Sequence, residues 1–430
     1  MPNRNASRST FSVGAAKISI TPPENLFPLT TFEGVQFRRV HAPIYVRAIV
    51  IANEEKTIAV LTFELLHAPR RHSLRRRISQ ALRIPPENVF LAATHNHSFL
   101  PLSDEDGLIK SDNPNGDKTA QMEDICEESA FRAAVLAKER MIPARFGIGT
   151  GTSYINVNRD QEYVDGHDEG VNYAGPSDKC VEVLRFEDFS GKPIAFWINY
   201  AVHPNCEVLA GCEKDDAALS GDLSGVTSQY IEDRFDGAVA MWTNGAEGNQ
   251  NPIAKNYCPV FAPDGSHSWG KIGEGIRVYN QALGIQHALD VLKANETAQM
   301  ADCLSISLCR RSITLPGMQP NAATIGTLPN GKWEMENAEP VEIRLQMLCL
   351  NDIVFYFISG EPVNQIATRI KELSPYPHTM IVGISDGHSG YFPDEYGYAA
   401  KTFEYYLARV RECPASSFLR NFTEMLEDLA

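Results

Sequence analysis

The chain has 430 residues, 43% of them hydrophobic, with 39 basic side chains against 54 acidic ones and a formal net charge of −15. The acidic excess is spread along the sequence, which argues against a nucleic-acid or anionic-membrane partner. The sequence has no apolar run of the roughly 18 residues that span a membrane, no signal-peptide core and no CxxC pair among its nine cysteines, which together predict a cytoplasmic protein with reduced thiols.

Strands and helices are predicted to alternate along the chain, because alternating or continuous apolar runs favour strands and apolar residues three or four apart favour helices. Strands are expected at 44–51, 57–63, 88–94, 180–188, 193–202, 237–243, 341–350, 352–359 and 378–385. Helices are expected around 74–82, 126–137, 223–231 and 363–370. The mixture predicts an α/β or α+β fold. No linker is visible, so one large domain over residues 11–430 should follow a flexible stretch at 1–10.

Unusual polar clusters follow the ends of predicted strands. "THNHS" (94–98) carries His95 and His97, "NYAVHPN" carries His203, and "NGAEGNQNP" follows the strand at 237–243. Glu361, in "ISGEPVNQ", lies between a strand and a helix that Pro362 is expected to open. "DGHSGYF" (386–392) follows the last predicted strand. Because α/β sheets bind ligands beyond strand ends, these loops are expected to build one site.

The residue types in these loops suit a hydrolytic zinc centre, which needs about three nitrogen or oxygen ligands and an open position for water. His95, His203 and Glu361 would be the ligands. Along an extended chain His95 and His97 point the same way, so His97 could act as general acid or base. Taken singly, each feature has a plainer interpretation: polar loop residues, a satisfied buried histidine, a capping glutamate and a turn-rich loop.

Taken in order, the motifs over residues 11–405 resemble those of the neutral, non-lysosomal ceramidases. The opening "VGAAKISITPP" and "HAPIYVRAIVI" resemble the start of that family, and "THNHS" and "NYAVHPN" resemble its two histidine motifs. "INVNR" resembles its Asn-Arg element, "SGDLSG" its S-x-D-x-x-G segment and "SGEP" its G-E motif. "GYFPDEYGYAAKTFE" resembles its tyrosine segment. The resemblance implies a ceramidase-like catalytic domain with the site in loops at strand ends.

The resemblance also assigns roles to residues. It implies a zinc ion held by His95, His203, Glu361 and Tyr391, with His97 as the proton-transfer partner and Arg159 as a substrate or oxyanion contact. The family has a serine where this chain has Asn249, whose amide is expected to orient substrate instead. Phe403 stands at the family's second active-site tyrosine. The chain also ends where ceramidases continue into an immunoglobulin-like domain.

The function expected from the sequence is zinc-dependent hydrolysis of an amide bond in a small soluble substrate, through zinc-activated water. Two alternatives stay open: an ester or cyclic-amide hydrolase on the same zinc centre, and a non-catalytic relative that retains metal and binds a ligand. Three further residues are weaker candidates. Asp222 is expected mainly to cap a helix that begins at Leu223, His388 either reaches the site or faces solvent, and Cys206, with Cys212 nearby, is expected to pack rather than bind metal.

Overall fold

A computed structural model describes residues 10–31, 35–99, 102, 114–164, 166–208, 217–328 and 331–429. It confirms the mixed α/β class. Within these residues, three large sheets share one topology: three antiparallel neighbours, a helix, a fourth strand parallel to the third, and a second helix. The sequence shows no internal repeat, so this threefold β-β-β-α-β-α plan becomes visible only in the structure.

The three modules follow one another along the chain. The first is β1 (Ser12–Ser19), β4 (Tyr45–Ala52), β5 (Thr57–Phe63), α1 (Arg71–Leu82), β6 (Val89–Ala93) and α2 (Asp117–Glu139). The second is β8 (Arg145–Thr152), β11 (Cys180–Glu187), β12 (Pro193–Tyr200), α3 (Asp222–Arg234), β14 (Val239–Asn244) and α4 (Ile276–Asn295). The third is β18 (Ile306–Pro320), β19 (Met335–Leu350), β20 (Ile353–Ile358), α5 (Asn364–Leu373), β22 (His378–Val382) and α8 (Ala415–Asp428).

Shorter elements connect the modules and surround their edges. They are β2 (Leu29–Thr30), β3 (Gln36–Val40), β7 (Ile142–Pro143), β9 (Asn156–Tyr163), β10 (Gly166–Asn172), β13 (Ala217–Leu219), β15 (Gln250–Pro252), β16 (Tyr257–Phe261), β17 (His267–Lys271), β21 (Glu361–Pro362), β23 (Tyr391–Phe392), α6 (Glu395–Ala400) and α7 (Phe403–Leu407). The β9–β10–β15 sheet lies beside the functional loops described below.

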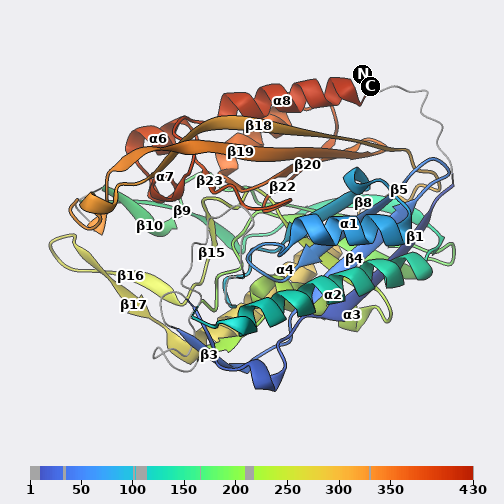
Figure 1. Cartoon of the computed structure of the whole chain (residues 1–430), viewed down its shortest axis with the longest axis horizontal. Coiled ribbons are helices and arrows are strands. Elements are labelled where there is room, and N and C mark those ends of the chain that lie inside the picture. Colours follow the sequence, from blue (N-terminus) through green and yellow to red (C-terminus); the bar gives the residue numbers. More distant parts are fainter. Residues whose placement is uncertain are drawn as a thin grey trace.

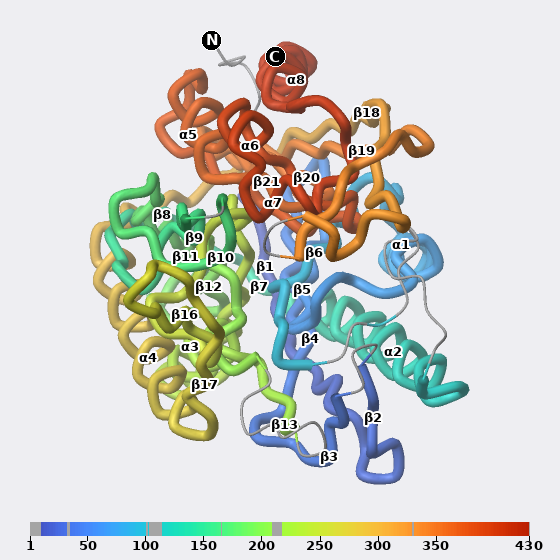
Figure 2. The backbone as a smooth tube through the Cα atoms, turned by 90° about the vertical axis from the view of Figure 1, so that its left-hand side faces the viewer, coloured from blue at the N-terminus to red at the C-terminus, as the bar shows by residue number. Residues whose placement is uncertain are grey.

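The three sheets pack their inner faces on one shared core and are covered outside by their own helices. Alternate strand residues point to opposite faces. Buried apolar residues of each sheet contribute both to the shared core and to an outer core, so both faces of each sheet are apolar. In the shared core, Phe90 contacts Phe357 with ring centroids 4.9 Å apart, and Trp197 stacks on Phe355 at 4.0 Å. Outside, α1 and α2 cover the first sheet, α3 and α4 the second, and α5 and α8 the third, as Figures 1 and 2 show.

The closing parallel pair of each module sets the position of the functional loops. The parallel pairs are β5–β6, β12–β14 and β20–β22. Parallel strands end at the same edge of a sheet. All the polar clusters found in the sequence follow the carboxyl ends of these strands, as predicted.

The prediction for the segment that follows Glu361 is wrong. Pro362 does not open a helix, because α5 begins at Asn364. Glu361 and Pro362 instead form β21, which pairs with Tyr391 and Phe392 of β23. This pairing needs a close approach of two chains at Gly360, where a Cβ would lie 2.5 Å from the carbonyl oxygen of Gly390.

His287, on α4, makes the stability of the fold depend on pH. Its ring lies in the second module's outer core, 3.1 Å from Ser153 Oγ and 3.3 Å from Trp242 Nε1, which donates to its Nε2. Burial lowers the pKa of His287 from 6.5 to about 3. The folded protein therefore binds fewer protons than the unfolded chain below pH 6.5, and the stability present above pH 6.5 is lost as the pH falls toward 3.

We expect His287→Gln to reduce this acid sensitivity. Between pH 7 and pH 5 the variant should lose about 2 kcal/mol less unfolding free energy than the wild type, since one pKa unit corresponds to about 1.4 kcal/mol. Urea denaturation at the two pH values measures the difference. An equal loss in both proteins would show that His287 is not held neutral by burial.

Candidate metal centre

The "THNHS" loop places two histidines against each other, but not by the predicted route. His95 has a φ of 62°, so this stretch is not extended and the alternation argument does not apply. The loop is held by backbone bonds from Asn96 N to Leu65 O at 3.0 Å and from His97 N to Pro204 O at 3.0 Å. The rings of His95 and His97 still meet, with centroids 4.7 Å apart.

Backbone carbonyl groups orient the two predicted histidine ligands. His95 Nδ1 lies 2.9 Å from Leu66 O, and His203 Nδ1 lies 3.1 Å from Gln250 O. Each Nδ1 therefore carries the proton that it donates, which leaves each Nε2 as the lone-pair atom facing the cluster. Metal-binding histidines are commonly fixed in this way by a bond from the other ring nitrogen.

Glu361 is the centre of the cluster. Its Oε2 lies 3.2 Å from His95 Nε2 and 3.0 Å from His203 Nε2, and Tyr391 Oη lies 3.2 Å from His203 Nε2. The pairing of β21 with β23 brings Tyr391 beside Glu361. A tetrahedral ion with ligands about 2.0–2.1 Å away has ligand-to-ligand edges of about 3.3 Å. The three contacts that join the four predicted ligands therefore have the length expected for edges around a zinc-sized ion.

A second donor set overlaps the first. One nitrogen from each of His95, His97 and His203 lies within 4.8 Å of the others. His97 Nε2 is buried and has no hydrogen-bond partner among the described residues. His97 is thus close enough to be a ligand or to serve as the proton-transfer partner that the sequence predicts, and metal content distinguishes the two roles.

His388 belongs to the cluster, which the sequence left open. It is 5% exposed, and its Nε2 lies 2.7 Å from Glu361 Oε1, the carboxylate oxygen that faces away from His95 and His203. This contact fixes the orientation of the carboxylate. His388 therefore supports a ligand in the way that outer-shell groups support metal ligands.

Burial and the charges within the cluster shift the pKa values of Glu361, His203 and His97. Burial alone would raise the pKa of Glu361, but His95, His203 and His388 hold it well below its usual value. Burial, with the nearby Arg159, lowers the pKa of His203 to about 4. Burial and the neighbouring histidines also hold the pKa of His97 well below 6.5. At neutral pH Glu361 is therefore a carboxylate and His203 and His97 are neutral imidazoles, the forms that bind metal.

Arg159 lies at the edge of this cluster on β9. Its Nε donates to Glu404 Oε1 at 2.8 Å, and its Nη2 donates to Gly248 O at 2.5 Å. The guanidinium carbon is 5.3 Å from the Tyr391 ring centroid and 4.8 Å from that of Phe403. Arg159 is 2% exposed and brings a fixed positive charge to Tyr391, the predicted tyrosine ligand. Its predicted contact with substrate stays a prediction.

Asn249 is bonded on all sides by protein groups. Its Nδ2 donates to Gln365 Oε1 at 2.9 Å and to Asp160 Oδ2 at 3.2 Å. Its Oδ1 accepts from Asn364 N at 3.0 Å and from Gln250 Nε2 at 2.9 Å. An amide offers two donor hydrogens and two acceptor positions, so these bonds use its capacity. The side chain joins the "GAEGNQ" loop to α5, and its predicted substrate contact stays a prediction.

Sequence reasoning missed several buried carboxyl groups around the site. Glu404 pairs with Arg159, and burial together with Glu404 raises the pKa of the neighbouring Asp160 to about 9. Glu247 is fully buried, and neither of its carboxylate oxygens has a hydrogen-bond partner among the described residues. Burial and the charge of Glu361 raise its pKa well above the usual value. In the sequence, the only signal for Glu247 is its position in "NGAEGNQ", one of the loops predicted to form the site.

The remaining candidates have structural positions. Asp222 is the first residue of α3, and its carboxylate accepts a hydrogen bond from Leu223 N. The carboxylate also accepts hydrogen bonds from Ser98 and Glu207, which lie in two other loops, so its role extends beyond the predicted helix cap. Cys206 is fully buried in the outer core of the second module, consistent with packing, and burial raises its thiol pKa well above the usual value. Cys212 lies outside the described residues. All cysteines within the described ranges are free thiols.

The fold, with loops from three modules converging on one cluster, is that of a neutral ceramidase-like protein. The crystal structure of the neutral ceramidase from Pseudomonas aeruginosa matches with a TM-score of 0.73 and 16% identity, over 98% of this chain and 75% of that one. A ceramidase complexed with C2 matches with a TM-score of 0.74 and 14% identity over the same shares. These matches confirm the predicted ceramidase-like catalytic-domain fold.

Curated sequences point to the same group of proteins. Neutral ceramidase B of Dictyostelium discoideum is 28% identical over 176 residues, which are 38% of this chain and 24% of the relative. Neutral ceramidase A of the same organism is 27% identical over 158 residues, 36% of this chain and 21% of the relative. The matched region therefore spans about a quarter or less of these relatives. No protein-family model matches the chain.

Within the described ranges, no helix has the length and hydropathy needed to cross a bilayer.

Proposed function

We propose that the protein is a zinc-dependent hydrolase that cleaves an amide bond. Three contacts carry this proposal: Glu361 Oε2 lies 3.2 Å from His95 Nε2 and 3.0 Å from His203 Nε2, and Tyr391 Oη lies 3.2 Å from His203 Nε2. These distances suit ligands around one tetrahedral ion. Likeness to neutral ceramidases supplies the reaction class. Since ceramide is an N-acyl lipid, a lipid amide is the first substrate to test, beside the small soluble amide expected from the sequence.

The four ligands would hold the ion, which when bound supplies Lewis acidity toward a carbonyl group and lowers the pKa of water. His97 lies beside His95 with a buried, unbonded Nε2 among the described residues. Because its pKa is held well below 6.5, it is neutral at pH 7 and can accept a proton at Nε2. It then returns that proton to the leaving nitrogen.

The other groups of the site fix the positions of Arg159 and Glu361. Glu404 and the Gly248 carbonyl fix the Arg159 guanidinium beside Tyr391, where its positive charge stabilises negative charge that develops on the substrate oxygen. His388 keeps the Glu361 carboxylate turned toward the histidines. These residues need not move during the reaction, which lowers its reorganisation cost.

A substrate panel with and without a chelator tests the proposal. We expect zinc-loaded protein to hydrolyse N-acyl sphingosine in detergent micelles or a short-chain N-acyl amine, and 1,10-phenanthroline to abolish the activity until zinc is added back. Matched esters and cyclic amides in the panel measure the alternative reactions. Absence of hydrolysis across the panel by protein that carries its metal would contradict the proposal.

One observation favours a second candidate, a metal-retaining protein that binds a ligand without turnover. Phe403 occupies the place of a family tyrosine, 4.8 Å from Arg159, and a phenyl ring cannot donate a hydrogen bond to an oxyanion. In that case the same substrates would bind and protect the protein from thermal unfolding without being cleaved.

A further inference from the structure

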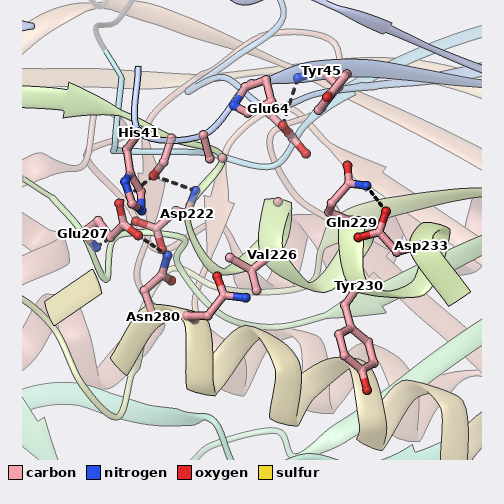
Figure 3. Close-up of a pocket in the computed structure, with 16 residues that line it drawn as sticks. His41, Tyr45, Glu64, Glu207, Asp222, Val226, Gln229, Tyr230, Asp233 and Asn280 are labelled. Atoms are coloured by element: carbon pink, nitrogen blue, oxygen red, sulfur yellow. Dashed lines mark hydrogen bonds between the residues drawn. The ribbon is translucent and has the colours of Figure 1, made fainter. Parts of the chain in front are cut away.

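A polar cavity lies apart from the metal centre, between α3, α4 and the start of β4 (Figure 3). Its volume is about 310 Å³, enough for a small organic molecule. The residues that line it include none of the proposed metal ligands and neither His97 nor His388. It is therefore a distinct site, between the first and the second module.

The cavity lining is acidic. It contains the carboxylates of Glu64, Glu207, Asp222 and Asp233 and no lysine or arginine. Arg47 pairs with Glu64 and also with Glu232, and Arg277 pairs with Glu207 at 3.1 Å; neither arginine lines the cavity. Asp222 and Asp233 have no ion-pair partner among the described residues. The lining therefore has a net negative charge that favours a cation.

A buried acceptor in the same lining lacks a partner. Asn280, 1% exposed, rises from α4 toward Glu207 and Asp222 in Figure 3. Its Nδ2 donates to Glu207 Oε1 at 2.5 Å, which fixes the orientation of the amide. Its Oδ1 then has no hydrogen-bond partner among the described residues. Leaving a buried carbonyl oxygen without a hydrogen bond is unfavourable, so a donor from a ligand would be favourable.

The wall of this cavity is connected to the metal-centre loops through Asp222. Asp222 Oδ2 accepts from Ser98 Oγ at 2.6 Å and from Glu207 N at 2.9 Å, and Oδ1 accepts from Cys206 N at 3.1 Å. Ser98 directly follows His97, and Cys206 lies three residues beyond His203. One carboxylate thus holds the two histidine loops together and forms part of the cavity lining.

We propose that this cavity binds a small protonated amine. The ammonium group donates to Asn280 Oδ1 and lies among the carboxylates, and its short carbon chain packs on Val226 and Pro43. Asp222 lines the cavity on one side and is hydrogen-bonded to the loops that carry His97 and His203 on the other, so it connects the bound amine to those loops. The amine site stands on its own observations and does not depend on the proposed hydrolysis.

Calorimetric titration with ethanolamine and putrescine tests the proposal, with ethylene glycol as the uncharged match. We expect the amines to bind and the glycol not to bind. Gln281 lines the cavity from an exposed position on α4, so its charge can be changed without disturbing the core. Gln281→Lys should weaken amine binding and Gln281→Glu should strengthen it, each by about 3- to 10-fold, as expected for one added charge several ångströms away.

Two further variants complete the test. Asn280→Leu should abolish amine binding; if it fails to fold, the opposite effects of the two Gln281 variants still decide. A His95→Ala, His203→Ala double variant should retain amine binding, because those residues do not line the cavity. Loss of binding in the double variant, equal binding of ethylene glycol, or no difference between the Gln281 variants would overturn the proposal. None of these measurements uses hydrolytic activity.

Discussion

Replacing His203 with alanine is expected to weaken metal binding by about 10²- to 10³-fold. Zinc sites bind with roughly 10–16 kcal/mol, so one of four ligands carries about 3–4 kcal/mol, and each 1.4 kcal/mol is about tenfold in affinity. Metal content by mass spectrometry after dialysis should fall from about one ion per chain to a trace, and hydrolysis should fall with it.

His72→Ala provides the matched control, since His72 is an exposed histidine on α1 outside the cluster. That variant should keep its metal. If His203→Ala retained a full complement of metal with unchanged affinity, the assignment of the ligand set around Glu361 would be wrong.

His97→Ala is expected to lower kcat by about 10²- to 10⁴-fold while the metal is retained, because a positioned general acid or base contributes about that much. The pH profile should change as well, since the group that accepts the proton is gone. Measuring kcat and metal content on the same preparation separates two roles for His97.

A variant that turns over within about threefold of the wild type would contradict the proton-transfer role. A variant that loses its metal would instead make His97 a ligand, in the set with His95 and His203 whose nitrogens lie within 4.8 Å of one another. His97→Gln adds a useful comparison, because the amide can donate a hydrogen bond but cannot carry a proton at neutral pH.

The candidate site was predictable from sequence where its position depends on strand ends. His95, His203 and Glu361 follow β6, β12 and β20, and strong apolar runs mark those strands. The rule that α/β sheets bind ligands beyond strand ends then brings the three together. The hairpin of β4 and β5 and the helices α1 and α3 were predicted for similar local reasons.

What the sequence could not reveal depends on contacts between distant segments. Tyr391 adjoins Glu361 only because two-residue strands pair, and two residues carry no periodic signal. His388 reaches Glu361 from a loop whose path is set by tertiary packing, so a local pattern leaves its exposure open. The prediction that Pro362 opens a helix failed because β21 pairing replaces the helical start. The threefold module plan has no repeated residues that would reveal it.

The shared plan of the three modules has a consequence for how the protein assembles. The first module supplies His95, the second His203, and the third Glu361 and Tyr391, and His203 and Glu361 are 158 residues apart in sequence. Bringing together residues this far apart in sequence has a large entropy cost, so these contacts are expected to form slowly and late in folding. The proposed ion would be held by all three modules, so it would bind only after they have docked and would act as a reversible cross-link among them. At a thousandfold excess over its dissociation constant, such an ion adds about 4 kcal/mol to the stability of the docked state.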